Sequence, residues 1–201
     1  MASLADAPKR RLGALEVPAM GLGCMGTTAF YGPADEAEGI ATIRRAIELG
    51  CTLLDTSDVF GPFTNEELVG KAIEGVPRDK LIVCTKFGIM LRMRPDGTPD
   101  MRMCGTAAHC KAACKSSLKR LGLDYIDVYY LHRKSSPPAG TQHSIEESIT
   151  AMKELVQEGK VKHIGVSESV TTDDLRKAHA IHPITAFSWN GACSRGTQRV
   201  I

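Results

Sequence analysis

Residues 124–132 read Asp-Tyr-Ile-Asp-Val-Tyr-Tyr-Leu-His, a largely apolar run that lies between two amphipathic segments. Before it, Ala107–Leu121 has its apolar residues at helical spacing and ends at Gly122. After it, Ile145–Glu158 has the same spacing and ends at Gly159. A short strand in which most residues are apolar is typical of a parallel sheet whose two faces are both covered.

The same alternation of strand and helix runs along most of the chain. Further helices are predicted at Glu36–Leu49, Asn65–Ile73 and Thr172–His179. Further strands are predicted at Ala19–Cys24, Thr52–Leu54, Leu81–Thr85, Val161–Val166 and Ile184–Phe187, and a hairpin is predicted over Arg11–Leu12 and Leu15–Val17. Strands that alternate with helices imply parallel β-α-β units. A closed barrel and an open doubly wound sheet both fit, and periodicity alone does not choose between them.

Composition predicts one soluble globular domain over residues 1–201, with residues 1–10 expected to be flexible. The chain is 43% hydrophobic and 24% charged, with a net charge of +2, which argues against nucleic acid or a membrane as partner. The sequence shows no signal peptide, which predicts a cytoplasmic location. The number of cysteines, seven, is odd, and several of them lie in apolar segments, so we expect reduced thiols, which agree with that location. The spacing of Cys104, Cys110 and Cys114 matches no recognised zinc pattern, so no metal site is predicted.

A glycine-rich motif follows the first predicted long strand. Residues 21–26 read Gly-Leu-Gly-Cys-Met-Gly and match the GxGxxG pattern of a dinucleotide-binding loop. A helix should open directly after such a loop, yet residues 27–33 intervene, and Asp55 lies too far along to be the acidic partner of the motif. The small residues are better explained by a strand end that something approaches closely.

Polar residues follow the apolar strands at their carboxyl ends. Asp55, Lys86 and His132 each end a strand, and Ser167 and Glu168 end another. In a closed barrel these ends meet at one mouth, where barrel enzymes place their active sites. A carboxylate stabilises a neighbouring ammonium, and that ammonium lowers the pKa of a nearby acid, while a histidine orients or polarises a carbonyl oxygen.

Four ordered motifs resemble the aldo-keto reductase family. They are Asp55-Thr56-Ser57-Asp58-Val59-Phe60-Gly61 with Asn65-Glu66-Glu67-Leu68-Val69-Gly70; Thr85-Lys86-Phe87-Gly88; Leu118-Lys119-Arg120-Leu121 with Asp124-Tyr125-Ile126-Asp127 and Leu131-His132-Arg133; and Gly165-Val166-Ser167-Glu168. The resemblance runs from about Arg11 to Ile184. It implies an incomplete (β/α)8 TIM barrel with about six parallel strands, about five outer helices and the N-terminal β-hairpin.

The resemblance also implies an activity, which is reduction of a small-molecule aldehyde or ketone by hydride from NADPH. The catalytic positions of the family fall on Asp55, Phe60, Lys86 and His132, and Lys86 with Asp55 would tune a proton-donating tyrosine. The cofactor-side positions fall on Gly23, Cys24, Met25, Asp55, Ser167 and Glu168, with Ser167 holding the nicotinamide carboxamide. The sequence predicts no oligomeric state and identifies no particular substrate.

Three features depart from the family. Phe60 occupies the tyrosine position, so the usual general acid is missing, which leaves a non-catalytic protein that binds a nucleotide or a partner as the alternative hypothesis. A full barrel needs about 250 residues, and the resemblance implies that this chain ends at about the sixth strand and lacks the C-terminal part. The family binds adenosine and phosphates with its seventh and eighth strands, so the sequence does not separate NADP from NAD. Residues 187–195 also differ from the family, and a frameshift or gene-model error is our hypothesis for that stretch and for the early end.

Overall fold

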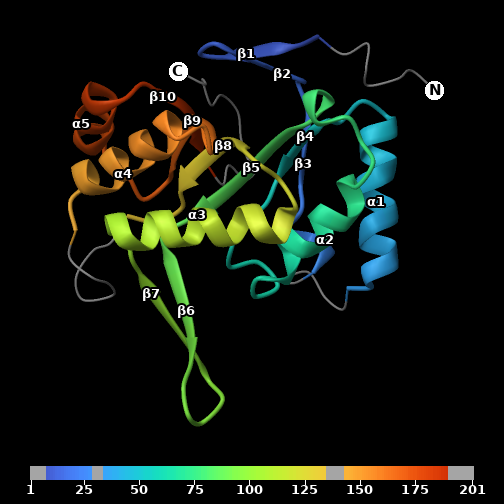
Figure 1. The fold of residues 1–201 in the computed structure, drawn as a ribbon, viewed down its shortest axis with the longest axis horizontal. Coiled ribbons are helices and arrows are strands. Elements are labelled where there is room, and N and C mark those ends of the chain that lie inside the picture. Colours follow the sequence, from blue (N-terminus) through green and yellow to red (C-terminus); the bar gives the residue numbers. More distant parts are fainter. Residues whose placement is uncertain (1–7, 29–33, 135–142, 190–201) are drawn as a thin grey trace, which may run out of the picture.

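The computed structural model describes residues 8–28, 34–134 and 143–189 (Figure 1). Its main sheet has six parallel strands that lie side by side in chain order: β3 (Gly21–Gly23), β4 (Leu53–Asp55), β5 (Ile82–Phe87), β8 (Ile126–Leu131), β9 (Val161–Ser167) and β10 (Ile184–Ser188). A doubly wound sheet reverses its strand order at a switch point, whereas a barrel sheet keeps chain order. The sheet is therefore part of a (β/α)8 barrel, as the sequence analysis predicted.

Within the described ranges, five α-helices connect the strands and lie along the outer side of the curved sheet (Figure 1). They are α1 (Glu36–Glu48), α2 (Thr64–Ile73), α3 (Ala107–Leu121), α4 (Ile145–Gln157) and α5 (Thr172–Ile181). Each helix contacts the next one in chain order. Several begin at side-chain caps, such as Asp35 before α1 and the capping box at Thr171 before α5. The five helices match the predicted ones within a few residues at each end.

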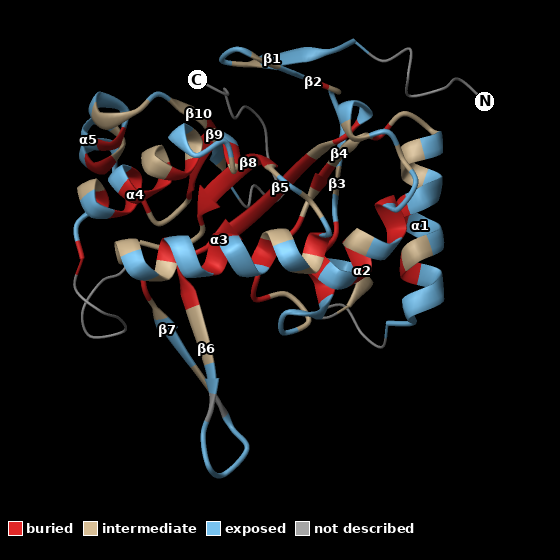
Figure 2. Cartoon of the chain, viewed as in Figure 1, coloured by how far each residue is buried: buried red, intermediate tan, exposed pale blue. Residues whose placement is uncertain are grey.

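The core lies on both faces of the sheet, and Figure 2 shows β5 and β8 as almost entirely buried. On the outer face, Leu54 and Val83 pack with α1 and α2, and Tyr129 and Ile164 pack with α3 and α4. The inner face carries a smaller cluster that includes Cys84, Val128, Tyr130 and Ala186. Both faces are covered, which explains why these strands are apolar throughout.

The predicted N-terminal hairpin is confirmed. Strands β1 (Arg10–Leu12) and β2 (Leu15–Val17) pair antiparallel, and Gly13 takes a positive φ of 57° in the turn. Leu12 and Leu15 pack against the inner cluster of the sheet. The hairpin thus covers the inner core at the end of the strands opposite to the predicted mouth.

A second hairpin was not predicted. Strands β6 (Ile89–Met93) and β7 (Pro99–Met103) pair antiparallel between β5 and α3, and they project away from the sheet (Figure 1). The backbone N–H of Cys104 donates to the carbonyl of Gly88, which closes the base of the hairpin.

The glycine-rich motif does not open a helix. Gly21–Gly23 forms β3, a single 3-10 turn (η2, Met25–Thr27) follows, and α1 begins only at Glu36. A further 3-10 turn, η3, spans Arg78–Lys80. The interpretation of this motif as a strand end rather than a dinucleotide loop is therefore confirmed. Among the described residues, no helix has the length and apolar character needed to cross a membrane. Residues 190–195, most of the stretch for which we hypothesise a frameshift, lie outside the described residues.

Candidate active site

The carboxyl ends of β4 and β5 bring Asp55 and Lys86 together. The Lys86 ammonium nitrogen lies 2.5 Å from Asp55 Oδ2 and donates to the Thr56 carbonyl oxygen at 2.8 Å. Lys86 is only 4% exposed, whereas the Asp55 side chain keeps 34% of its surface accessible. A buried ammonium needs such partners, because an unpaired charge in the interior is costly. The pair therefore fixes Lys86 at the mouth of the sheet.

His132 lies beside this pair at the end of β8. Its backbone N–H donates to the Phe87 carbonyl oxygen at 2.7 Å, and its ring Nδ1 lies 3.1 Å from the hydroxyl oxygen of Ser57. Burial lowers the pKa of His132 to about 3, and the positive charges of Lys86 and Arg133 act in the same direction. The imidazole is therefore neutral at physiological pH and acts as a hydrogen-bonding group rather than as a cation.

Phe60 completes the group. The centroid of its ring lies 5.4 Å from the Lys86 ammonium nitrogen and 5.9 Å from the centroid of the His132 ring, which it meets edge-on. The four positions that the sequence analysis assigned to catalysis, Asp55, Phe60, Lys86 and His132, thus lie together. The Phe60 ring is apolar. A tyrosine at this position would have both Lys86 and His132 as neighbours of its ring.

Ser167 and Glu168 lie at the end of β9. The Ser167 hydroxyl has two acceptors within reach of its single proton, Glu168 Oε2 at 3.0 Å and the Ser188 carbonyl oxygen at 3.2 Å. Arg133 pairs with Glu168 at 2.7 Å, which ties the ends of β8 and β9 together. Ser167 is 1% exposed, so its hydroxyl is held in place by β10.

Gly23, Cys24 and Met25 lie at the end of β3, next to Asp55. Gly23 is opposite Asp55 in the parallel ladder, and the Cys24 N–H donates to the Asp55 carbonyl oxygen at 2.8 Å. A Cβ built on Gly23 would have no atom within 4 Å, so there is open space over this strand end. Cys24 is fully buried and burial raises the pKa of its thiol to about 12, so its side chain faces the core as a neutral thiol.

These residues fit the nicotinamide end of a dinucleotide. A partly exposed carboxylate at Asp55, an ordered hydroxyl at Ser167 and open space above Gly23 lie at the carboxyl ends of strands of one sheet. Recognition of a carboxamide needs such hydrogen-bonding groups beside an uncrowded surface. In the described part of the chain, no group of three or more His, Cys, Asp and Glu side chains is arranged to hold a metal ion.

A second set of buried polar residues surrounds the site, and the sequence analysis gave these residues no role. The Asn65 side chain donates to the Cys24 carbonyl oxygen at 2.8 Å and accepts from the Thr56 hydroxyl at 2.5 Å. Glu66 accepts from the Thr85 hydroxyl and pairs with Arg120 at 2.6 Å. Both residues belong to the Asn-Glu-Glu-Leu motif at the start of α2, so this motif was the feature of the sequence that could have identified them as part of the site.

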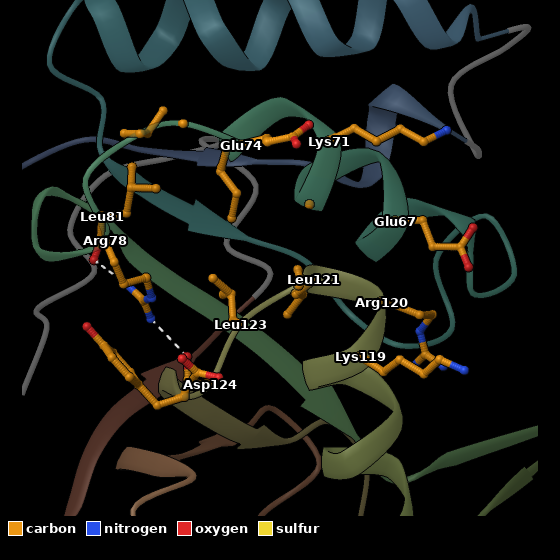
Figure 3. A pocket seen from close by; sticks show the side chains of 16 residues that line it. Glu67, Lys71, Glu74, Arg78, Leu81, Lys119, Arg120, Leu121, Leu123 and Asp124 are labelled. Atoms are coloured by element: carbon orange, nitrogen blue, oxygen red, sulfur yellow. Dashed lines mark hydrogen bonds between the residues drawn. The ribbon is translucent and has the colours of Figure 1, made fainter.

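A cavity of about 640 Å³ lies at the opposite end of the strands, between α2, α3 and the segments that lead into β5 and β8 (Figure 3). Its charged lining residues carry both signs and include Lys71, Glu74, Lys119 and Asp124. None of the four catalytic positions lines it. The cavity is therefore separate from the site at the mouth of the sheet.

Comparison with known proteins agrees with this geometry. The family model described as the aldo/keto reductase family matches residues 19–190. A probable aldo-keto reductase 1 from Glycine max is 48% identical over 172 residues, which cover 85% of this chain and 47% of that protein.

Solved structures of reductases are similar as well. Aldo-keto reductase AKR11C1 from Bacillus halodurans, in its holo form, has a TM-score of 0.76 at 33% identity, covering 91% of this chain and 57% of that one. An aldo-keto reductase from Klebsiella pneumoniae, solved in complex with NADPH, has a TM-score of 0.66 at 30% identity, covering 85% and 52%. The chain spans about half the length of these relatives. The family model covers most of the chain, and the positions predicted to be catalytic lie together at the mouth of a parallel barrel sheet, so the chain belongs to the aldo/keto reductase family.

Proposed function

We propose that this protein uses NADPH to reduce a small-molecule aldehyde or ketone to the alcohol. The observation that carries the proposal is the cluster of Lys86, Asp55 and His132 at the carboxyl ends of β4, β5 and β8, with Gly23 and Ser167 at the ends of β3 and β9. The NADPH complex of the Klebsiella pneumoniae relative supports the choice of cofactor. Reduced thiols support a cytoplasmic location, since all six cysteines among the described residues are free and buried.

When bound, NADPH supplies the hydride. Ser167 and Asp55 would bind and orient the nicotinamide end, and Gly23 leaves room for it. As hydride reaches the carbonyl carbon, negative charge develops on the carbonyl oxygen. The buried Lys86 ammonium favours that charge electrostatically, and the neutral His132 ring donates a hydrogen bond to it.

Phe60 should make this chemistry slow. A positioned general acid is typically worth about 10²–10⁴-fold in rate, and phenylalanine has no proton to give. His132 remains as a weaker donor, so we propose residual activity rather than none. Phe60 is also the observation that favours the second candidate function, in which the protein binds NADPH or a partner protein without catalysis.

The test is to follow NADPH consumption with a reactive aldehyde in the 201-residue protein and in two lysine variants. Lys86→Met should abolish turnover, because it removes the charge at the mouth. Lys80→Met is the matched control, because Lys80 is exposed and lies before β5 at the opposite end of the strand. Turnover that survives Lys86→Met would refute the assignment. NADPH binding without turnover in the parent protein would favour the non-catalytic function.

A further inference from the structure

His132 is the first member of a buried chain of hydrogen bonds. Its Nδ1 lies 3.1 Å from the Ser57 hydroxyl oxygen, which in turn lies 3.2 Å from Asp58 Oδ1. Ser57 is 0% exposed and Asp58 is 3% exposed. The Asp58 N–H donates to the Lys86 carbonyl oxygen at 3.3 Å, so the segment that carries both residues is fixed to the end of β5.

The surroundings of Asp58 favour its protonated form. Burial raises the pKa of Asp58 to about 8, and the neighbouring Glu66 carboxylate on α2 adds to the effect, whereas Ser57 and Arg120 oppose it. Arg120 on α3 is already paired with Glu66 at 2.6 Å. His109 on α3 and Arg92 on β6 are the other ionisable residues that line the cavity beside Asp58.

The chain of hydrogen bonds has two self-consistent arrangements of its protons. If Asp58 is protonated, it donates to Ser57, Ser57 donates to Nδ1 of His132, and the proton of the neutral ring is on Nε2. If Asp58 is ionised, Ser57 donates to Asp58 and accepts from Nδ1–H, and Nε2 is a bare acceptor. The second arrangement holds one proton fewer than the first, because one proton has left from Nε2 and the other two have each moved one step toward His132.

We propose that Asp58, Ser57 and His132 form a proton relay that supplies the carbonyl oxygen in place of the missing tyrosine. This inference rests on the proposed function. In this relay, Ser57 and Asp58 position the His132 ring and supply its proton, so both residues act through His132.

The step balances in atoms and charge. Hydride from NADPH forms the new C–H bond, and the electron pair of the carbonyl π bond moves to oxygen. His132 Nε2 gives its proton to that oxygen, Nδ1 takes the proton of the Ser57 hydroxyl, and Ser57 takes the proton of Asp58. The products are the alcohol, NADP⁺ and the Asp58 carboxylate, and the relay is left in its second arrangement.

Asp58 can be reprotonated from outside the mouth. A cavity of about 240 Å³ between α3, the β6 strand and the segment after β4 is lined by Asp58 together with His109, Arg92 and Ser116. Water in this cavity would reach Asp58 without passing the substrate. The relay therefore has an entry for protons at Asp58 and an exit at His132.

The first test needs no turnover. Nitrogen-15 NMR of the imidazole in the 201-residue protein reports which ring nitrogen of His132 carries the proton. We expect Nε2–H at pH 6 and a shift to Nδ1–H as the pH rises through about 8. Ser57→Ala and Asp58→Asn should each remove this shift. Ser148→Ala should keep it, because Ser148 is equally buried but lies on α4, where its hydroxyl donates to the Gly105 carbonyl oxygen. Nδ1–H in the parent at pH 6 would overturn the relay.

The second test measures turnover of NADPH and a reactive aldehyde. Ser57→Ala should lower kcat by about 10²-fold with little change in the Kd for NADPH, and Ser148→Ala should leave both unchanged. In the parent, kcat should fall as the pH rises through about 8, and Asp58→Asn should abolish that pH limb. Equal kcat values in Ser57→Ala and Ser148→Ala would overturn the relay. If the parent has no turnover, the proposed function fails, and the nitrogen-15 result by itself decides whether the relay's proton arrangement is correct.

Discussion

The ammonium nitrogen of Lys86 lies 5.4 Å from the centroid of the Phe60 ring. Lys86 is bound to Asp55, and Phe60 meets His132 edge-on. An aromatic ring with no ionisable group thus lies next to both a buried ammonium and a neutral imidazole. In this arrangement the charge of Lys86 is in place, but the group whose pKa it would lower is missing.

Restoring a tyrosine hydroxyl at this position should add a direct proton donor, stronger than His132, beside the carbonyl oxygen. We expect Phe60→Tyr to raise aldehyde reduction by about 10²–10⁴-fold, while affinity for NADPH stays nearly constant. Steady-state kinetics and calorimetric titration of NADPH measure the two effects separately. Phe63→Tyr is the control, because Phe63 is 39% exposed and contacts Arg120 rather than Lys86. Equal turnover in the parent and in Phe60→Tyr would mean that the acid is elsewhere.

Arg120 should be essential to the fold at neutral pH. Its guanidinium is the cation paired with the buried Glu66, and Asp58 is a second buried carboxyl group close by. Removing one partner of a buried ion pair typically costs about 3–5 kcal/mol. We therefore expect Arg120→Met to lower the free energy of unfolding by that order at pH 7, as measured by urea denaturation.

The matched control for Arg120→Met is Lys119→Met, which removes the neighbouring exposed charge on α3. It should change the free energy of unfolding by less than about 0.5 kcal/mol. If both variants lowered the free energy of unfolding by a similar amount, the Glu66–Arg120 pair would contribute little to stability.

The raised pKa of Asp58 has a consequence for stability. Its pKa is about 8 in the folded protein against an ordinary value of 3.8, so between these pH values the folded state holds one more proton than the unfolded state. The stabilising contribution is complete below pH 3.8 and is lost as the pH rises through about 8, with a slope of at most about 1.4 kcal/mol per pH unit.

Asp58→Asn cannot ionise, so its free energy of unfolding relative to the parent should increase steadily from pH 5 to pH 8. His132 has the opposite dependence, because its pKa is lowered to about 3 and its contribution is lost as the pH falls below 6.5. That contribution is present in both proteins and cancels in the comparison. Curves of stability against pH that run parallel for the parent and Asp58→Asn would contradict the raised pKa.

Gly165 and Gly23 should respond differently to the same added methyl group. A Cβ on Gly165 would overlap with the Tyr130 ring, and it would lie 3.1 Å from the Ala186 carbonyl oxygen. We expect Gly165→Ala to cost about 1–3 kcal/mol through overpacking. A Cβ on Gly23 would have no atom within 4 Å, so the Gly23→Ala variant should be as stable as the parent. Its affinity for NADPH should fall, because the methyl group occupies the space proposed for the nicotinamide end. Thermal unfolding and NADPH titration of both variants test this, and equal stability of the two would show that Tyr130 moves aside easily.

Much of the architecture was predictable from local patterns in the sequence. The apolar runs that became β5, β8 and β9 and the helical spacing of α3 and α4 depend only on neighbouring residues, so periodicity and the glycines at helix ends predicted them. The hairpin of β6 and β7 was missed, because residues 89–103 mix Met, Arg, Asp and Pro without a clear alternation of apolar and polar positions.

The sequence by itself also determined that Asp55, Lys86 and His132 would lie together, since parallel strands place their carboxyl ends at one edge. Only the tertiary structure decided which polar groups meet beyond that edge. Ser57 contacts His132 across 75 positions of the chain, and Glu66 meets Arg120 across 54. Such pairs depend on the register of the strands and on how α2 and α3 pack side by side, whereas periodicity reports only whether a residue faces the core.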